Sequence, residues 1–146
     1  MYINAQEYLE DIRHKGREIQ NLKRALSAID KDLEASAINY DPNTIKTNVP
    51  RKDGLEELAF KHMERREKII KALETAITER VNAIENAIEY IKQIESDAQK
   101  EVLILRYIDS KSWPEIMEIR ECDDLRSQYR LHERALESLQ KVMTIV

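Results

Sequence analysis

Four residues near the C-terminus have side chains that could read the edges of DNA bases. Arg126 and Arg130 are four residues apart, and Gln128 and Tyr129 lie between them. Arginine forms two hydrogen bonds to guanine, and glutamine pairs in the same manner with adenine. On a helix, however, two arginines at this spacing could equally be an ordinary solvated face. The helix taken alone favours that plainer interpretation, so the surrounding sequence has to decide.

The surrounding segment predicts two short helices joined by a tight turn. It runs from Ser112 to Leu139 and reads SWPEIMEIRECDDLRSQYRLHERALESL. A helix-turn-helix places the first turns of its second helix in the major groove, while the flanking turn and later turns pass the DNA backbone. On this basis the predicted base contacts are Arg126, Gln128, Tyr129 and Arg130. The predicted phosphate contacts are Lys111, Ser112 and Arg134.

Two long helices are predicted before this segment. The first runs from Asn4, its predicted cap with Glu7 three residues on, to about Leu33. The second runs from Asp53 to about Glu95, and both have apolar residues at steps of three and four. They predict an antiparallel hairpin stem over residues 1–95, with a connecting loop at 34–54. The second helix is apolar beyond a single seam, so we expect a third helix on the stem or self-association into a homo-oligomer.

The C-terminal segment predicts a three-helix module, residues 96–146, with helices at 97–108, 113–120 and 124–142. Ser96 with Gln99, and Ser112 with Glu115, have the spacing of capping boxes. Trp113 opens the middle helix beside an isoleucine stripe and is expected to anchor the core. The whole chain is therefore predicted to be all-α.

Several classes of protein have little support in the sequence. The three histidines are far apart and expected on helix surfaces, and no HExxH, CxxC, GxxxxGK or GxSxG string occurs. We therefore expect no catalytic residues, no metal and no cofactor. No apolar run approaches the ~20 residues that cross a bilayer, and the N-terminus lacks a signal pattern. With a single cysteine, a reducing, cytoplasmic setting is the simplest expectation.

The C-terminal third resembles the fourth conserved region of bacterial sigma factors, a helix-turn-helix that reads promoter DNA. The matching strings are QKEVLILRYIDSKSWPEIMEI and YRLHERALESLQK. Together with the stem and its Pro-containing loop, this layout is similar to small proteins of Gram-positive phages and prophages. That family is grouped with phage late-gene and autolysin-type transcriptional regulators, and its functions are largely unassigned. The resemblance implies a sequence-specific DNA-binding regulator in the bacterial host cell that could act with RNA polymerase.

Two positions depart from the sigma-factor pattern. The turn usually carries a glycine, and here Glu121 or Cys122 stands in its place. The second helix usually has an inward Val or Leu near its middle, and here Ser127 or Gln128 takes that position. The register of the predicted recognition helix is therefore open by one residue.

Charge gives the competing hypothesis its support. The net charge is −4 at pH 7, and residues 97–146 carry eight Lys or Arg against ten Asp or Glu. Within this acidic module the stretch from Leu125 to Lys141 is basic, with four cationic and two anionic side chains. Because phosphate contacts dominate DNA affinity, we expect weak binding by a monomer. The alternative is a non-catalytic adaptor that assembles through its stem, its arginines paired with Glu133, Glu137 or stem carboxylates.

Overall fold

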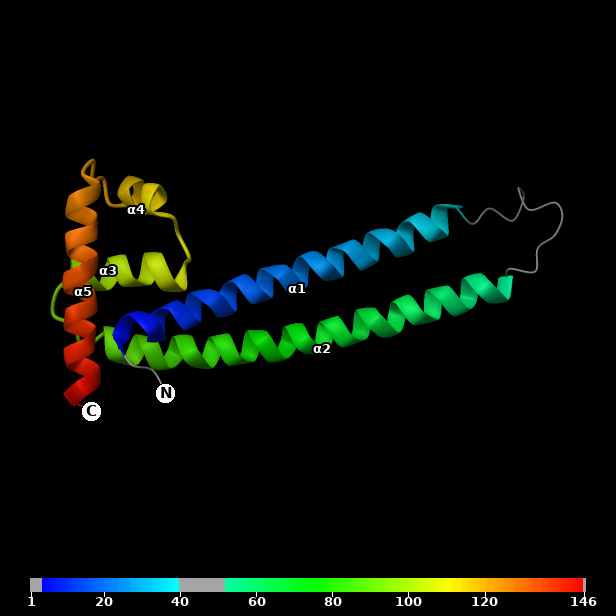
Figure 1. Cartoon of the computed structure of the whole chain (residues 1–146), viewed down its shortest axis with the longest axis horizontal. Helices are drawn as coiled ribbons and strands as arrows, with labels where there is room; N and C mark the ends of the chain where they lie inside the picture. The colour runs from blue at the N-terminus through cyan, green and yellow to red at the C-terminus, as the bar shows by residue number, and fades with distance from the viewer. Residues whose placement is uncertain (1–3, 40–51, 146) are drawn as a thin grey trace. The chain divides into compact units, whose positions relative to one another are not determined.

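A computed structural model of the chain describes residues 4–39 and 52–145, and these are helices joined by short turns (Figure 1). No strand occurs in these two ranges. The elements are α1 (Ala5–Asn39), α2 (Lys52–Ile91), α3 (Asp97–Leu103), the π-helical segment η1 (Ile104–Ile108), α4 (Trp113–Ile119) and α5 (Leu125–Ile145). The all-α prediction is confirmed.

The long helices differ from their predicted bounds at one end each. α1 continues beyond the predicted end at Leu33, because the following residues, Glu-Ala-Ser-Ala-Ile-Asn, are largely good helix formers. α2 is continuous and ends at Ile91, before the predicted end at Glu95. Of the predicted loop at 34–54, residues 40–51 lie outside the described part of the chain.

Polar side chains cap the helices where the sequence predicted caps. Each accepts a hydrogen bond from the backbone N–H three residues on, which satisfies one of the free donors of a helix start. The pairs are Asn4 with Glu7 (2.9 Å), Ser96 with Gln99 (3.3 Å) and Ser112 with Glu115 (3.3 Å). Pro114 follows Ser112 in the first turn of α4, where its missing N–H costs little.

The chain divides into two compact units. Unit 2 (Glu18–Ile77) contains the C-terminal part of α1 and the N-terminal part of α2. There the two helices lie side by side (Figure 1), and Nε of Arg66 donates to Oδ1 of Asp30 at 2.7 Å. Both side chains are more than a third exposed, so this ion pair contributes little to stability.

Unit 1 (Met1–Arg17 and Thr78–Val146) contains the C-terminal helices together with the ends of α1 and α2. This division differs from the expected boundary between residues 95 and 96. The physical reason is size, since a module of fifty residues buries too little apolar surface alone. The core therefore draws on both sides of that boundary; its largest fully buried side chains are Leu9, Ile12, Ile91, Val102, Leu103, Tyr107, Ile116 and Leu139.

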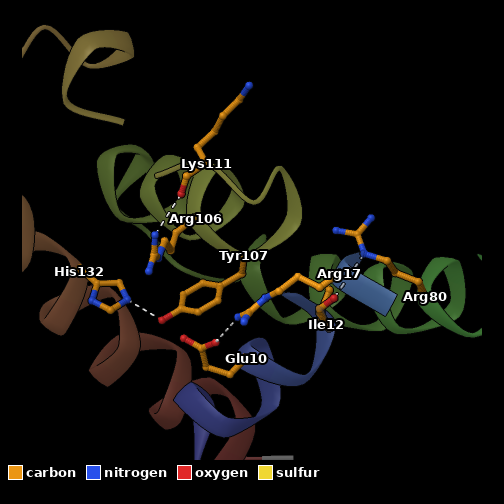
Figure 2. Close-up of polar contacts among 8 residues, drawn as sticks. All are labelled: Glu10, Ile12, Arg17, Arg80, Arg106, Tyr107, Lys111 and His132. Carbon is orange, nitrogen blue, oxygen red and sulfur yellow. Dashed lines mark hydrogen bonds and ion pairs between the residues drawn. The ribbon is translucent and has the colours of Figure 1, made fainter. Parts of the chain in front are cut away.

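Arg80 ties the helix pair of unit 1 to the end of η1. Its Nε donates to the Ile12 carbonyl at 3.3 Å (Figure 2), and its Nη2 donates to the Ile108 carbonyl at 2.6 Å. The guanidinium crosses α1 beside Gly16, where an added Cβ would lie 3.0 Å from Nε of Arg80. Gly16 therefore gives this arginine room to reach both carbonyl groups.

Candidate nucleic-acid interface

The turn between α4 and α5 is a Schellman motif. The N–H of Cys122 donates to the Met117 carbonyl at 2.9 Å, and the N–H of Glu121 donates to the Glu118 carbonyl at 3.2 Å. Glu121 has a φ of 54°, the left-handed conformation that glycine usually supplies at this position. Of the two residues that the sequence left open, Glu121 therefore replaces the glycine.

Asp124 sets where α5 begins and which way its first turn faces. Its Oδ1 accepts from the N–H of Arg126 at 3.0 Å, and its Oδ2 accepts from the hydroxyl of Ser127 at 2.9 Å. The hydrogen bond from Ser127, followed by that from the Arg126 backbone, lowers the pKa of the Asp124 carboxyl. A carboxylate at this end also suits the helix dipole. The start of the candidate recognition helix is thus fixed by local contacts.

Three arginines form an exposed row along α5: Arg126, Arg130 and Arg134. Their four-residue spacing places them on one face of the helix. Glu133 and Glu137 share that face, but among the residues the structure describes no carboxylate lies within ion-pair distance of the three guanidinium groups. The arrangement that would favour the adaptor hypothesis, with these arginines neutralised by neighbours, is not found there.

The two other predicted base contacts differ in their exposure. Tyr129 is 41% exposed, and its ring stands edge-on to Trp113 with the centroids 5.0 Å apart. Gln128 is only 2% exposed, so its prediction as a base contact is wrong. With α5 starting at Leu125, Gln128 points to the interior and takes the place of the expected inward Val or Leu.

The predicted phosphate contacts are only partly available. Arg134 is exposed and the Lys111 ammonium lies 3.7 Å from the Glu115 carboxylate, with both side chains substantially in solvent. The Ser112 hydroxyl, by contrast, donates to Oε1 of Glu115 at 3.0 Å while it caps α4. Ser112 is therefore engaged in holding the helix start, and Lys111 and Arg134 remain the accessible cations.

A half-buried aromatic cluster beneath this surface was not predicted from the sequence. The guanidinium of Arg106 lies 4.8 Å from the centroid of the Trp113 ring, and its Nη1 donates to the Lys111 carbonyl at 3.1 Å (Figure 2). The ring of His132 lies edge-on to Trp113 at 4.9 Å. Trp113 packs against the core as expected, but it is half-buried and also faces the surface between α4 and α5.

His132 corrects the expectation that every histidine lies on a helix surface. Its ring is half-buried, and Nε2 lies 2.6 Å from the Tyr107 hydroxyl (Figure 2). Burial, and secondarily the Arg106 charge, lowers the pKa of His132 from 6.5 to about 4. The spacing of His132 from Gln128, Ala135 and Leu139 is the helical signal that would have placed it on the inward face.

Comparison with known proteins does not assign the chain to a family. No protein-family model matches the chain, and no curated protein or solved structure is significantly similar to it. In the described ranges, no helix is long and apolar enough to span a membrane. The same ranges hold no group of three His, Cys, Asp or Glu side chains placed to bind a metal. The arginine row on α5 presents three exposed cations on one helix face, and such a face can meet a polyanion.

Proposed function

We propose that this protein is a non-catalytic, sequence-specific DNA-binding regulator of transcription, of the phage or prophage type, that acts in the host cytoplasm. The observation that carries the proposal is the unpaired row of Arg126, Arg130 and Arg134 on an otherwise acidic chain. Three exposed guanidinium groups without an ion-pair partner on one helix face are free to meet phosphates and base edges.

The contacts that hold α5 in place also suit a DNA-binding helix. The Asp124 cap fixes the first turn, and the Glu121 turn sets α4 against α5. Recognition needs side chains held by rigid elements, because a mobile helix would lose the register of its base contacts. In the proposed complex, base edges meet Arg126, Tyr129 and Arg130, and phosphates meet Lys111 and Arg134.

Affinity in this proposal requires more than one copy or a partner. The basic face is small, so a homo-oligomer or RNA polymerase would supply further contacts. Exposed apolar side chains on α2 support self-association: in unit 2 Phe60 is 63% exposed and Met63 62%, and in unit 1 Val81 and Ile88 are exposed. Exposed apolar groups gathered on one element are typical of interaction sites.

Binding to the DNA upstream of the protein's own coding sequence tests the proposal. Fluorescence anisotropy at low salt should show binding by the wild type and its loss in the triple variant Arg126→Gln, Arg130→Gln, Arg134→Gln. The control variant Lys68→Gln, Lys71→Gln, Lys92→Gln removes the same charge from exposed α2 positions and its neighbouring turn. It should bind as the wild type does. Equal losses in both variants would mean that net charge alone explains the loss of DNA binding. The assignment of the DNA-binding surface to α5 would then be wrong.

The second candidate function is a helical adaptor. The exposed apolar residues of α2 and the acidic balance of the chain favour it. A wild-type protein that binds no duplex DNA at low salt, yet forms a stable oligomer through Phe60 and Met63, would be an adaptor and not a regulator. Sedimentation of the wild type and of Phe60→Ser/Met63→Ser separates the two cases.

A further inference from the structure

A groove runs between α4 and α5. Its volume is about 990 Å³. The floor is apolar and is built from Trp113, Pro114, Met117, Leu125 and Tyr129. Leu125 and Tyr129 are each more than 40% exposed, so their apolar surface is accessible to a partner.

Carboxylates line the lip of this groove. Glu118 comes from α4, Glu121 from the turn and Asp123 from the segment before α5, and all three side chains are exposed. Within the described ranges none of them makes an ion pair. The one cation in the wall, Arg106, is half-buried over Trp113 and bonded to the Lys111 carbonyl. The lip therefore presents negative charge beside an apolar floor.

We propose that this groove binds a cationic amphipathic segment of another protein. Apolar side chains of the segment would cover the floor, and its Lys or Arg residues would meet Glu118, Glu121 and Asp123. An apolar groove with a charged rim is the usual receptor for an amphipathic helix, and opposite charges set its specificity. A phosphate group inside the groove is disfavoured because the lip would repel it, whereas Arg126 and Arg130 do not line the groove and remain available to DNA phosphates.

Charge also argues against the chain's own exposed apolar site as the occupant. Among the described residues the most exposed aromatic side chain is Phe60, and its neighbours on the surface of α2 are Glu56, Glu64 and Glu57, the last paired with Lys61 at 3.8 Å. These carboxylates would face the acidic lip of the groove in a second copy. A partner that carries its own basic residues avoids this repulsion.

Binding in the groove has a consequence for the proposed DNA site. Leu125 and Tyr129 lie in the first turns of α5, which are also the turns that would enter the major groove. A segment seated on them would block DNA, so the partner would act as an inhibitor of DNA binding. This second step rests on the proposed function, whereas peptide binding itself does not.

The chain's single tryptophan provides a probe of the groove, because Trp113 lies in its floor. The full protein is titrated with a synthetic amphipathic peptide of about 14 Lys and Leu residues, and with its Glu/Leu counterpart. We expect saturable binding of the Lys/Leu peptide with a change in Trp113 emission, and none with the Glu/Leu peptide. Binding of both peptides alike, or of neither at about 100 µM, would overturn the proposal.

Matched variants separate the groove from general attraction to an acidic protein. Glu118→Gln, Glu121→Gln, Asp123→Asn should weaken binding about tenfold at low salt. The control Glu74→Gln, Glu85→Gln, Glu95→Gln removes three exposed carboxylates elsewhere and should change affinity by less than about twofold. Equal weakening by the two variants would contradict the site. Circular dichroism checks that each variant keeps its helical fold.

Competition is measured separately, with labelled duplex DNA displaced by the Lys/Leu peptide. Displacement from the wild type, and its loss in the lip variant, is the expected result. If the peptide binds the groove but the protein binds no DNA, the docking site stands and the proposed function fails. If DNA binds but the lip variant and its control take up the peptide equally, the function stands and the docking site fails.

Discussion

The Tyr107 hydroxyl lies 2.6 Å from Nε2 of His132 and links η1 to α5. The two rings are stacked, with centroids 5.6 Å apart. Burial raises the pKa of the Tyr107 phenol above its ordinary range and lowers that of His132 to about 4. At neutral pH the phenol therefore keeps its proton and the imidazole is uncharged, so the two share a hydrogen bond between neutral groups. This contact holds α5, the helix that carries the arginine row, against η1.

Protonation of His132 should destabilise unit 1 in mild acid. The unfolded chain has the ordinary pKa of 6.5 and the folded chain about 4, so the unfolded state binds more protons between these values. The stability that the neutral imidazole contributes is complete above about pH 6.5 and is lost as the pH falls towards 4. The loss should be about 1–2 kcal/mol, because the ring is only partly buried.

Urea unfolding of the wild type and of His132→Gln, at pH 7.5 and 4.5, checks this prediction. Comparing the two proteins cancels the contribution of the carboxylates, and the glutamine amide can still form a hydrogen bond with the Tyr107 hydroxyl. The wild type should lose more free energy of unfolding between the two pH values than the variant does. Parallel pH dependences would show that His132 does not carry the effect.

Arg80 and Gly16 should be energetically coupled. Replacing Arg80 with Leu removes hydrogen bonds to two backbone carbonyl groups and should cost about 1–3 kcal/mol. Gly16→Ala would ordinarily stabilise a helix by about 1 kcal/mol, but here the new Cβ meets the Arg80 guanidinium. We expect Gly16→Ala to give no gain in the wild type and the full gain beside Arg80→Leu. Additive effects in a double-mutant cycle by chemical denaturation would contradict the close approach.

The positive φ of Glu121 predicts a stabilising substitution. Glu121→Gly should raise the free energy of unfolding by up to about 1 kcal/mol, because glycine adopts this backbone conformation without the strain of a side chain. Glu118→Gly is the matched control, since it removes the same charge from the interior of α4 and should be destabilising by about as much. Thermal melts of both variants measure the difference; a lower melting temperature for Glu121→Gly would contradict the turn geometry.

The sequence was most informative where structure depends on neighbouring residues. The caps at Asn4, Ser96 and Ser112 follow from a side chain and a backbone N–H three residues apart, and all were predicted. The direction of each α5 side chain depends instead on where that helix starts, and a shift of one residue turns the helix by about 100°. Polarity suggested that Gln128 faces DNA, whereas the Asp124 cap turns it into the core.

Gln128 should therefore matter to stability and not to DNA binding. Its Oε1 is buried and accepts no hydrogen bond from the described part of the chain, so it loses hydration without compensation. Gln128→Leu should raise the free energy of unfolding by about 1 kcal/mol and leave DNA affinity unchanged. Urea denaturation and anisotropy on the same samples test both halves. A selective loss of DNA affinity would return Gln128 to the interface.

Other features of the site could not be predicted from the spacing of residues in the sequence. Sequence periodicity predicted a helix over 97–108, but it did not predict that η1 would be π-helical or that Arg106 would lie over Trp113. Nor did it predict that Leu9 and Ile12, at the start of the chain, would complete the core of the C-terminal module. The packing of Leu9 and Ile12 joins residues far apart in the sequence, and spacing within one helix carries no information about contacts between different helices.

The salt dependence of DNA binding tests the central claim most directly, because it counts the phosphates that the protein neutralises. Anisotropy is measured on the upstream duplex and on a scrambled duplex, from about 50 to 250 mM salt. Arg134→Gln should weaken both duplexes alike and flatten the salt slope by about one, whereas Arg126→Gln/Arg130→Gln should abolish the preference for the upstream duplex. Unchanged slope and preference in these variants, or no binding by the wild type at about 50 mM salt, would contradict a DNA-reading role for α5.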